Sequence, residues 1–362
     1  MSKLSGNKGE WSEVYVFLKL LAAQKLYAAD KNLNRIEGSF FDILKIIRTE
    51  SFGKLEFRID KTANVITVVD AKTKNEMLSL PCDKFKQEAT YLYNELCSAS
   101  TRSFEVPHTE NFLNNLKVNT LKAKSTDKSD IQIQLHDIDT GYETIQGFSI
   151  KSRLGQPSTL VNAGKTTNFI YEITGDVDDN IMNIFNSKKK FKDKFEFLSE
   201  KNCNVEYSTM NNTIFQNNLL LIDGDLPKIC ASMLKMFYTK GISTISNSLE
   251  QLNQINPNHY DLSSGHPFYE YKFKKFLVDS ALGMTPSSIW NGIADATGGY
   301  IIVKENGDIV CYHLYNRNEF ESYLVQNTKF ETPSTSRHDF GYIYKENNKY
   351  YLKLNLQIRF IK

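Results

Sequence analysis

The sequence DIQIQLHDI (residues 130–138), followed by TIQGFSIKS (144–152), decides the fold that we expect. Apolar and polar residues alternate along the first stretch, so that Ile131 and Ile133 lie on one face of a β-strand. Residues 139–142, Asp-Thr-Gly-Tyr, have the composition of a turn between the two stretches. The pattern therefore predicts an antiparallel β-hairpin.

Helices and strands are mixed on both sides of this hairpin. Because they do not alternate regularly, we expect an α/β or α+β fold with a mixed central sheet flanked by helices. Asp83 has the residue type and position of a helix N-cap. The expected helices span residues 10–28, 83–98, 157–163, 178–200, 225–240 and 269–282; the expected further strands span 55–60, 64–70 and 168–174, with hairpins at 298–314 and 341–361.

The composition excludes several classes of protein. The formal net charge of the 362-residue chain is only +2, which neither demands nor excludes a nucleic-acid partner. Its five cysteines are scattered without CxxC spacing, so we expect no disulfide framework and no zinc site. The polar start, MSKLSGNKGEW, has no apolar signal segment, and no apolar run approaches the ~20 residues that span a membrane. We therefore expect a soluble, cytoplasmic protein.

The hairpin carries residues that suit metal-dependent phosphodiester cleavage. Asp130 begins the first strand and Ser149-Ile150-Lys151 ends the second. Residues two apart on a strand share a face, so Ser149 and Lys151 point the same way. A carboxylate can hold Mg²⁺ beside a scissile phosphate, and a lysine can orient or activate water. Ser149, however, stands where the chemistry calls for a second carboxylate.

A glutamate near the start of the chain can supply the missing charge. Gly9-Glu10-Trp11-Ser12-Glu13 begins the first expected helix, and Glu10 and Glu13 are three residues apart on that helix. We expect both as candidate metal ligands. Acidic residues in a first helical turn can instead simply complement the helix dipole. The hairpin alone also allows a plain alternative, a lysine on an edge strand and an aspartate in a turn.

Long segments of the chain resemble the HpaII-like type II restriction endonucleases. The most specific one, GFSIKSRLGQPSTLVNAGKTTNFIYEI, contains the Ser149 and Lys151 positions. Further segments follow in the same order as in that family, from one end of the chain to the other. They are NKGEWSEVYVFLKLLA (7–22), LGMTPSSIWNGIADATGGYIIVKENGDIVCYH (282–313), TKFETPSTSRHDFGYIY (328–344) and LNLQIRF (354–360).

The resemblance implies a nuclease of the PD-(D/E)xK fold that uses Mg²⁺ and cleaves double-stranded DNA within a palindromic CCGG site. It implies Asp130 and Lys151 as the core active-site pair, with Glu13 as the accessory acid. The departure at Ser149 leaves the number of bound metal ions open. A catalytic core is expected over residues 1–175, with an inserted hairpin and helix near 50–110. A helical and hairpin-rich DNA-recognition region is expected over 176–362. A palindromic site suggests a homodimer, and a restriction enzyme implies a cognate DNA methyltransferase.

Several polar residues of the chain are candidates for DNA contact. Arg337, His338 and Asp339 put a donor and an acceptor into one loop, as the recognition of G·C pairs requires, although an ordinary capping turn has the same composition. Arg359 and Arg153 are the next candidates for base contacts. The candidates for phosphate contacts are Thr166, Thr167 and Asn168 after the hairpin and the basic run Lys188, Lys189 and Lys190, which can equally be a solvated helix face.

Two other functions fit the same residues. A structure-specific nuclease of this fold, such as a resolvase or repair enzyme, would nick branched or damaged DNA and ignore an intact plasmid. A catalytically silent DNA-binding protein would bind DNA and not cleave it with Mg²⁺ or Mn²⁺, and the serine at position 149 fits that alternative.

Overall fold

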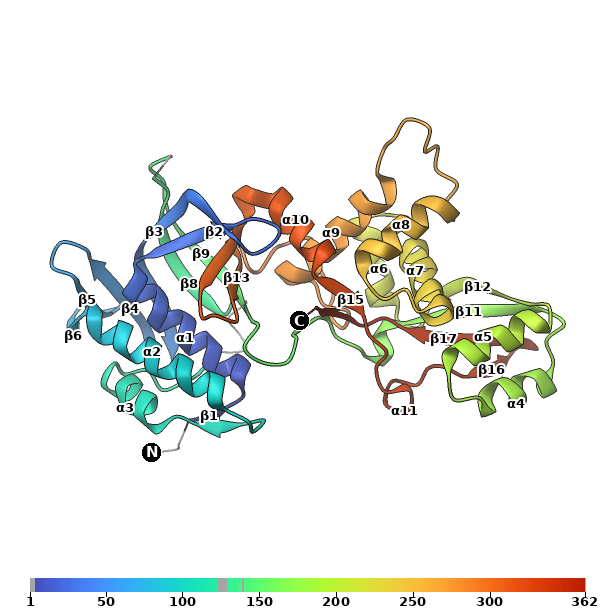
Figure 1. The fold of residues 1–362 in the computed structure, drawn as a ribbon, viewed down its shortest axis with the longest axis horizontal. Coiled ribbons are helices and arrows are strands. Elements are labelled where there is room, and N and C mark those ends of the chain that lie inside the picture. Colours follow the sequence, from blue (N-terminus) through green and yellow to red (C-terminus); the bar gives the residue numbers. More distant parts are fainter. Residues whose placement is uncertain (1–3, 123–128, 139, 362) are drawn as a thin grey trace. The chain divides into compact units, whose positions relative to one another are not determined.

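The computed structural model describes residues 4–122, 129–138 and 140–361, which form two compact units. Unit 1 contains the chain up to Pro157 together with Asp295–Phe320, and unit 2 contains Ser158–Ala294 and Glu321–Ile361. This division differs from the expected boundary at residue 175. The reason is that the hairpin expected at 298–314 pairs with a strand of the first unit and so returns to it. Figure 1 shows the elements of both units.

The sheet of unit 1 contains nine of the described strands. Their order is β2-β14-β13-β9-β8-β3-β4-β5-β6. Because β2 also pairs with β3, the strands from β2 to β3 in this order form a closed ring. Because β13 runs parallel to β9 while β8 is antiparallel to it, the sheet is mixed, as expected. The strands are β2 (Lys25–Ala29), β3 (Arg35–Glu50), β4 (Gly53–Asp60), β5 (Val65–Asp70), β6 (Glu76–Pro81), β8 (Ile131–His136), β9 (Glu143–Ser152), β13 (Gly299–Val303) and β14 (Ile309–His313).

The hairpin that decided the fold is present as β8 and β9. Ile131 lies opposite Phe148 and His136 opposite Glu143, so all of β8 pairs with the first part of β9. The turn expected at 139–142 includes Asp139, which lies outside the described residues. The hairpins β4–β5 and β13–β14 are also confirmed.

The first helix of unit 1 is shorter than its apolar pattern indicates. Helix α1 (Lys8–Ala23) begins at a capping box formed by Asn7 and Glu10. It ends because Gln24 adopts a left-handed conformation with φ of 57°, after which β2 begins. The expected helix over 10–28 is therefore wrong in its last turn. Apolar residues of a short buried strand continued the helical pattern there.

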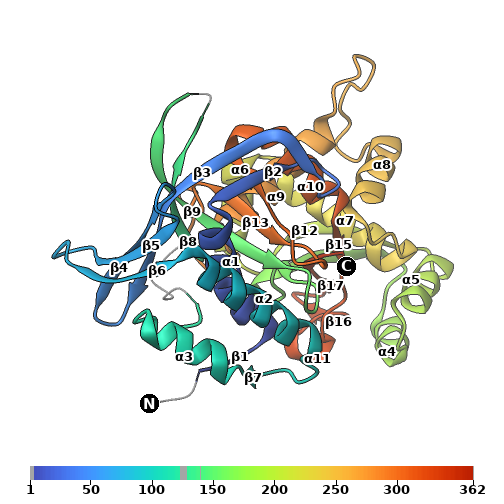
Figure 2. The same ribbon diagram turned by 60° about the vertical axis from the view of Figure 1, so that its left-hand side comes forward.

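Two more helices accompany α1 in unit 1. Figure 2 shows α1 and α2 (Cys82–Ser98) lying alongside each other, with α3 (Pro107–Asn115) near them. Their core contains fully buried aromatic rings such as Trp11, Phe17 and Phe85. Pro81, and not Asp83, is the N-cap of α2, and Asp83 lies in its first turn. A short pair of strands, β1 (Ser5–Gly6) and β7 (Phe104–Glu105), lies beside these helices.

Unit 2 contains two small sheets and most of the helices. The four-stranded sheet has the order β12-β11-β17-β16, with β11 (Asn168–Gly175), β12 (Cys203–Met210), β16 (Ile343–Glu346) and β17 (Lys349–Asn355). The three-stranded sheet has the order β10-β18-β15, with β10 (Thr159–Val161), β15 (Thr328–Phe330) and β18 (Ile358–Phe360). The helix expected over 157–163 is therefore wrong. This segment is a strand because β18, which is remote in sequence, pairs with it.

The helices expected at 178–200, 225–240 and 269–282 are present, with one break, whereas those at 213–222 and 245–255 were not expected. The region 178–200 forms two helices, because Lys188, Lys189 and Lys190 lie between α4 and α5. The helices are α4 (Asp179–Ser187), α5 (Phe191–Glu200), α6 (Thr213–Ile222), α7 (Leu226–Lys240), α8 (Ile245–Ile255), α9 (Phe268–Leu282) and α11 (Thr335–His338), with the 3-10 turn η1 (Lys165–Thr167); α10 (Arg317–Gln326) begins in unit 1 and ends in unit 2. None of the described helices is long and apolar enough to cross a membrane.

Candidate active site

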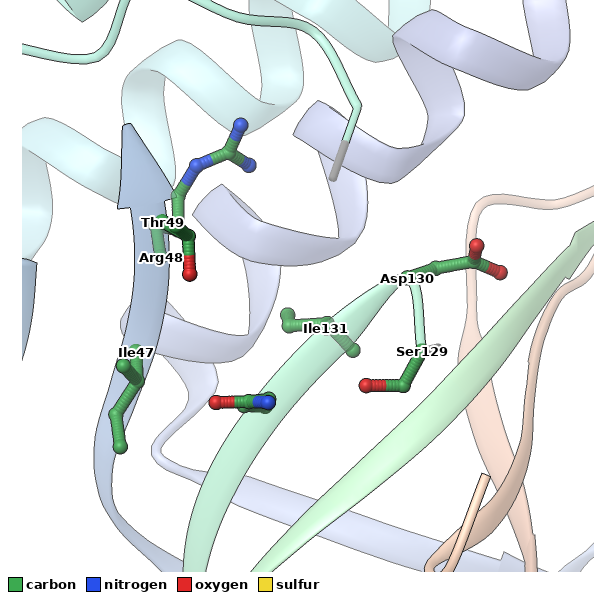
Figure 3. A pocket seen from close by; sticks show the side chains of 7 residues that line it. Ile47, Arg48, Thr49, Ser129, Asp130 and Ile131 are labelled. Carbon is green, nitrogen blue, oxygen red and sulfur yellow. The ribbon is translucent and has the colours of Figure 1, made fainter. Parts of the chain in front are cut away.

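Asp130 lies immediately before β8, where the backbone of β9 fixes it. Its N–H donates to the carbonyl of Phe148 over 2.9 Å. Its carboxylate oxygen Oδ2 accepts two hydrogen bonds, from the backbone N–H of Ile150 at 2.6 Å and from the hydroxyl of Ser149 at 3.1 Å. Figure 3 shows this carboxylate pointing away from Arg48. The strand pairing thus sets both the position and the orientation of the carboxylate.

Ser149 connects Asp130 to Lys151. The ammonium of Lys151 donates to Ser149 Oγ over 3.2 Å, while the same hydroxyl donates to Asp130. A hydroxyl can do both, because it has one proton to donate and two lone pairs that accept. An ionised carboxylate at position 149 would accept from the lysine but could not donate to Asp130. The serine therefore makes a continuous hydrogen-bonded chain from the lysine to the aspartate.

The ammonium of Lys151 lies in a partly buried environment with two opposing electrostatic influences. Burial lowers its pKa, while the negative charges of Asp130 and Glu13 act against that shift. The nitrogen also lies 5.3 Å from the ring centroid of Tyr300, a residue of the neighbouring strand β13. The two carboxylates and the ring favour the charged form of the lysine, which is the form that can attract a phosphate.

The two glutamates of α1 differ in what surrounds them. Both oxygens of Glu10 accept hydrogen bonds, from the backbone N–H of Asn7 at 2.9 Å and from the ammonium of Lys122 at 2.9 Å. These bonds lower the pKa of Glu10. The charge of Glu13 instead acts on Lys151, Arg48 and Lys122. Of the two, Glu13 is thus the one whose charge reaches the hairpin lysine.

The chemistry of these side chains fits a magnesium ion. Mg²⁺ binds through one or two carboxylates and completes its shell with waters and phosphate oxygens. Asp130 and Glu13 supply two carboxylates whose charges both reach Lys151. Within the ranges that the structure describes, no group of three or more His, Cys, Asp or Glu side chains is arranged to hold a metal.

Arg48 lies beside this site and was missed by sequence reasoning. It belongs to β3 and lines, with Asp130, a hollow of about 20 Å³ (Figure 3). The guanidinium donates to the carbonyl of Thr120 at 2.7 Å, forms an ion pair with the buried Glu50 at 3.4 Å and packs over the Phe17 ring. An arginine within an apolar strand gives no motif, so only the strand pairing reveals its position.

In unit 2, the loop around Arg337 is built on buried polar residues. Arg337 is exposed, and Asp339 ends the short helix α11 in a left-handed conformation with φ of 57°. The side-chain amide of Asn168 donates to the carbonyl of His338 at 2.8 Å, and Lys353 pairs with Asp339 at 3.0 Å. Burial lowers the pKa of His338. These contacts therefore hold the backbone of the loop that carries the exposed Arg337.

The remaining candidates for DNA contact fall into two groups. Thr167 and Asn168 are fully buried and serve internal hydrogen bonds, for example from the Thr167 hydroxyl to the carbonyl of Gly164 at 3.0 Å. The expectation that these two residues touch phosphates is corrected for that reason. The others are at least partly exposed: Thr166, Lys188, Lys189, Lys190, Arg359 and Arg153. Of these, Arg359 forms an ion pair with Glu331 at 2.9 Å, and Arg153 lies 4.0 Å from Glu305.

Comparisons with known proteins place the chain in a family. The sequence model of the HpaII restriction endonuclease family matches residues 7–360. The type II restriction enzyme HpaII of Haemophilus parainfluenzae is 43% identical over 358 residues, which are 99% of each chain. No solved structure matches the chain. The match extends over both units and includes every candidate residue discussed above. The chain therefore belongs to the HpaII restriction endonuclease family, and it is a type II restriction endonuclease.

Proposed function

We propose that this enzyme hydrolyses phosphodiester bonds of double-stranded DNA with Mg²⁺ at a short palindromic site, CCGG. The observation that carries the proposal is the hydrogen-bonded chain from Lys151 through Ser149 to Asp130. Similarity to the HpaII enzyme over 99% of both chains supports the choice of site. The mixed sheet of unit 1, with the aspartate and the lysine on adjacent strands, supports a PD-(D/E)xK core.

Each residue of the site has a role in this proposal. Asp130 and Glu13 would hold the metal ion. When bound, Mg²⁺ polarises the phosphate and lowers the pKa of a coordinated water. Lys151 faces the reacting phosphate with its positive charge, and Ser149 orients both Lys151 and Asp130 through its hydroxyl. Glu10 is left out of the metal site, because the helix cap and Lys122 already engage its two oxygens.

Recognition of DNA is proposed to depend mainly on unit 2. Arg337 is positioned to donate to a guanine edge and Asp339 to accept from cytosine, which are the contacts that G·C pairs favour. The exposed Lys189 and Lys190, with Thr166, suit phosphates. Arg359 and Arg153 are the second candidates for base contacts, because each of them is paired with an acidic side chain. A homodimer would bind a two-fold symmetric site with one subunit on each half. A methyltransferase would protect the host DNA.

Digestion of a fully sequenced plasmid, with the ends of every fragment mapped, tests the proposal. We expect discrete fragments whose ends all lie within CCGG, and none without a divalent metal. A plasmid from which every CCGG has been removed is the matched control and should stay intact. Cleavage of the control plasmid would refute the specificity. Nicking confined to branched DNA would instead identify a structure-specific nuclease.

A further inference from the structure

Two serines, the buried Ser12 and the partly buried Ser152, join helix α1 to strand β9 next to the proposed active site. Ser12 is fully buried, and its hydroxyl lies 2.8 Å from that of Ser152. Ser12 Oγ also lies 2.6 Å from the carbonyl oxygen of Lys8, one helical turn earlier. On the other side, the backbone N–H of Leu154 donates to Ser152 Oγ over 3.2 Å. Polar groups of the helix and of the strand end thus form one connected hydrogen-bond network.

The backbone approaches closely at the same place. A Cβ atom added to Gly155 would lie 3.3 Å from the Cβ of Lys8, which is tighter than ordinary van der Waals contact. The chain after β9 therefore passes close against the first turn of α1, and an additional side chain there would require Lys8 to shift by a few tenths of an ångström. This close backbone packing does not depend on the serine hydroxyls. The packing and the hydroxyl pair each hold the start of α1 against the end of β9.

The two serines are direct neighbours of proposed active-site residues in the sequence. Ser12 precedes Glu13, and Ser152 follows Lys151. Successive residues of a strand point to opposite faces. Ser152 can therefore contact the helix while Lys151 contacts Ser149 on the other face of the sheet. The position of the helix relative to the strand, in turn, determines where Glu13 lies relative to Lys151.

We propose that Ser12 and Ser152 are positioning residues, which hold Glu13 at a fixed place relative to Lys151 and Asp130. The inference rests on the proposed function of Glu13 as a metal ligand. Neither serine touches the metal or DNA in this proposal. The hydroxyl pair acts through the helix, and its loss lets the first turn of α1 move on the strand. Because a misplacement of about 1 Å can cost on the order of 10²-fold in rate, a small movement is sufficient.

Ser12→Ala and Ser152→Ala, singly and together, test the proposal, and Ser248→Ala is the matched control. Ser248 of α8 is also fully buried, and its hydroxyl donates to a carbonyl four residues earlier, Thr244 at 2.9 Å. The control therefore loses the same bond within a helix but no bond to β9. Two quantities are measured: the single-turnover cleavage rate in Mg²⁺, and the affinity of the enzyme–DNA complex for Ca²⁺ by calorimetry, which requires no cleavage.

We expect each single alanine variant to lose roughly tenfold in rate and in Ca²⁺ affinity, and the double variant to lose hardly more, because the pair acts as one contact. Ser248→Ala should match the wild type in both quantities. Full additivity of the two losses, or wild-type Ca²⁺ affinity in both single variants, would overturn the proposal. Since Ser152→Ala breaks the contact from the strand, it tests the idea even if Ser12→Ala folds poorly.

Glu13→Gln separates this inference from the function on which it rests. If Glu13→Gln loses activity and Ca²⁺ affinity while both serine variants keep them, only the positioning role fails. If Glu13→Gln cleaves and binds Ca²⁺ normally, the proposed ligand itself is wrong, and the positioning role falls with it.

Discussion

In the proposed active site, the hydroxyl of Ser149 takes the position at which a second carboxylate of the hairpin was expected. It accepts from Lys151 and donates to Asp130, so the positive and negative groups are held a fixed distance apart without direct contact. Both bonds to Asp130 reach Oδ2, from Ser149 and from Ile150. These two donors fix the orientation of the carboxylate that we propose as a metal ligand.

Lys151→Ala should abolish most of the cleavage and leave DNA binding nearly unchanged. In the proposed mechanism the ammonium faces the phosphate at which charge develops, and loss of one such contact costs on the order of 10²–10³ in rate. The rate is measured by single-turnover cleavage, and the affinity by titration of labelled DNA with Ca²⁺. Lys45→Ala, which removes a partly buried lysine of β3 from its ion pair with Glu56, is the control. Near-normal turnover of Lys151→Ala would move the active site away from the hairpin.

Asp130→Asn should be inactive in Mg²⁺ while it keeps the native fold. The amide oxygen of asparagine can still accept from Ser149 and from the backbone of Ile150, so the shape is retained and the charge that holds the metal is lost. Cleavage assays and calorimetric titration with Ca²⁺ check this expectation, with thermal unfolding as the test of the fold. If this variant cleaves normally, Asp130 is not the principal metal ligand, and Glu13 is the next candidate to test.

At the scale of elements, local patterns predicted most of the secondary structure and failed where distant pairing decides it. The alternation in β8 and β9 and the Asn-Gly turn between β13 and β14 gave the right hairpins. The segment 159–161 was expected as a helix, because nothing near it in sequence indicates its partner β18. The left-handed Gln24 that ends α1 has no side-chain signature either.

The same limit applies to the site. The order Asp130, Ser149, Lys151 follows from strand periodicity, so these residues could be named from the sequence and the structure brings them together. Arg48 could not be named, because its place beside Asp130 depends on the pairing of β3 with β8. Thr167 and Asn168 were expected at the surface, since their polarity gives no sign that a buried loop needs their hydrogen bonds.

A histidine of β14 should make the stability of unit 1 sensitive to acid. His313 is buried between strands, with Nε2 2.5 Å from Gln146 Oε1 and Nδ1 accepting from the N–H of Tyr315 at 3.1 Å. Burial lowers its pKa to about 4. An unfolded histidine titrates near ~6.5. Between these values the unfolded state binds more protons, so stability falls as the pH falls.

We therefore expect the unfolding free energy of the wild type to fall by about 2 kcal/mol more than that of His313→Gln between pH 7 and pH 5. Urea titrations at both pH values measure the difference, and the comparison of the two proteins cancels the carboxylates that titrate in both. His266→Gln, at an exposed position in unit 2, controls for the loss of a surface imidazole. Parallel pH dependence in the wild type and His313→Gln would show that His313 does not make this contribution.

At the scale of the whole molecule, the chain leaves unit 1 after β9 and returns to it with β13. The proposed catalytic residues belong to unit 1, and the loop of Arg337 and the basic run belong to unit 2. Chemistry and base recognition are therefore proposed for different parts of one chain. This separation predicts that binding specificity and cleavage rate respond to different substitutions.

The basic run between α4 and α5 is proposed to meet phosphates. Lys189 and Lys190 are exposed, whereas Lys188 packs over the Phe197 ring at 5.1 Å. Replacing the exposed pair with alanine should weaken binding to every DNA sequence alike. The slope of log K against log salt should become shallower by roughly one unit for each phosphate contact removed. An unchanged slope would mean that these lysines are only a solvated linker.

Arg337→Ala should instead weaken binding to CCGG by roughly 1–3 kcal/mol and change binding to unrelated DNA very little, because a base contact contributes only on the cognate site. The salt slope should stay nearly constant, since no phosphate contact is lost. Arg102→Ala, at an exposed position in unit 1, is the matched loss of one positive charge. Titrations on CCGG and scrambled duplexes at several salt concentrations distinguish the two effects. A uniform loss on both duplexes would make Arg337 a phosphate contact, and Arg359 would then be the next base reader to test.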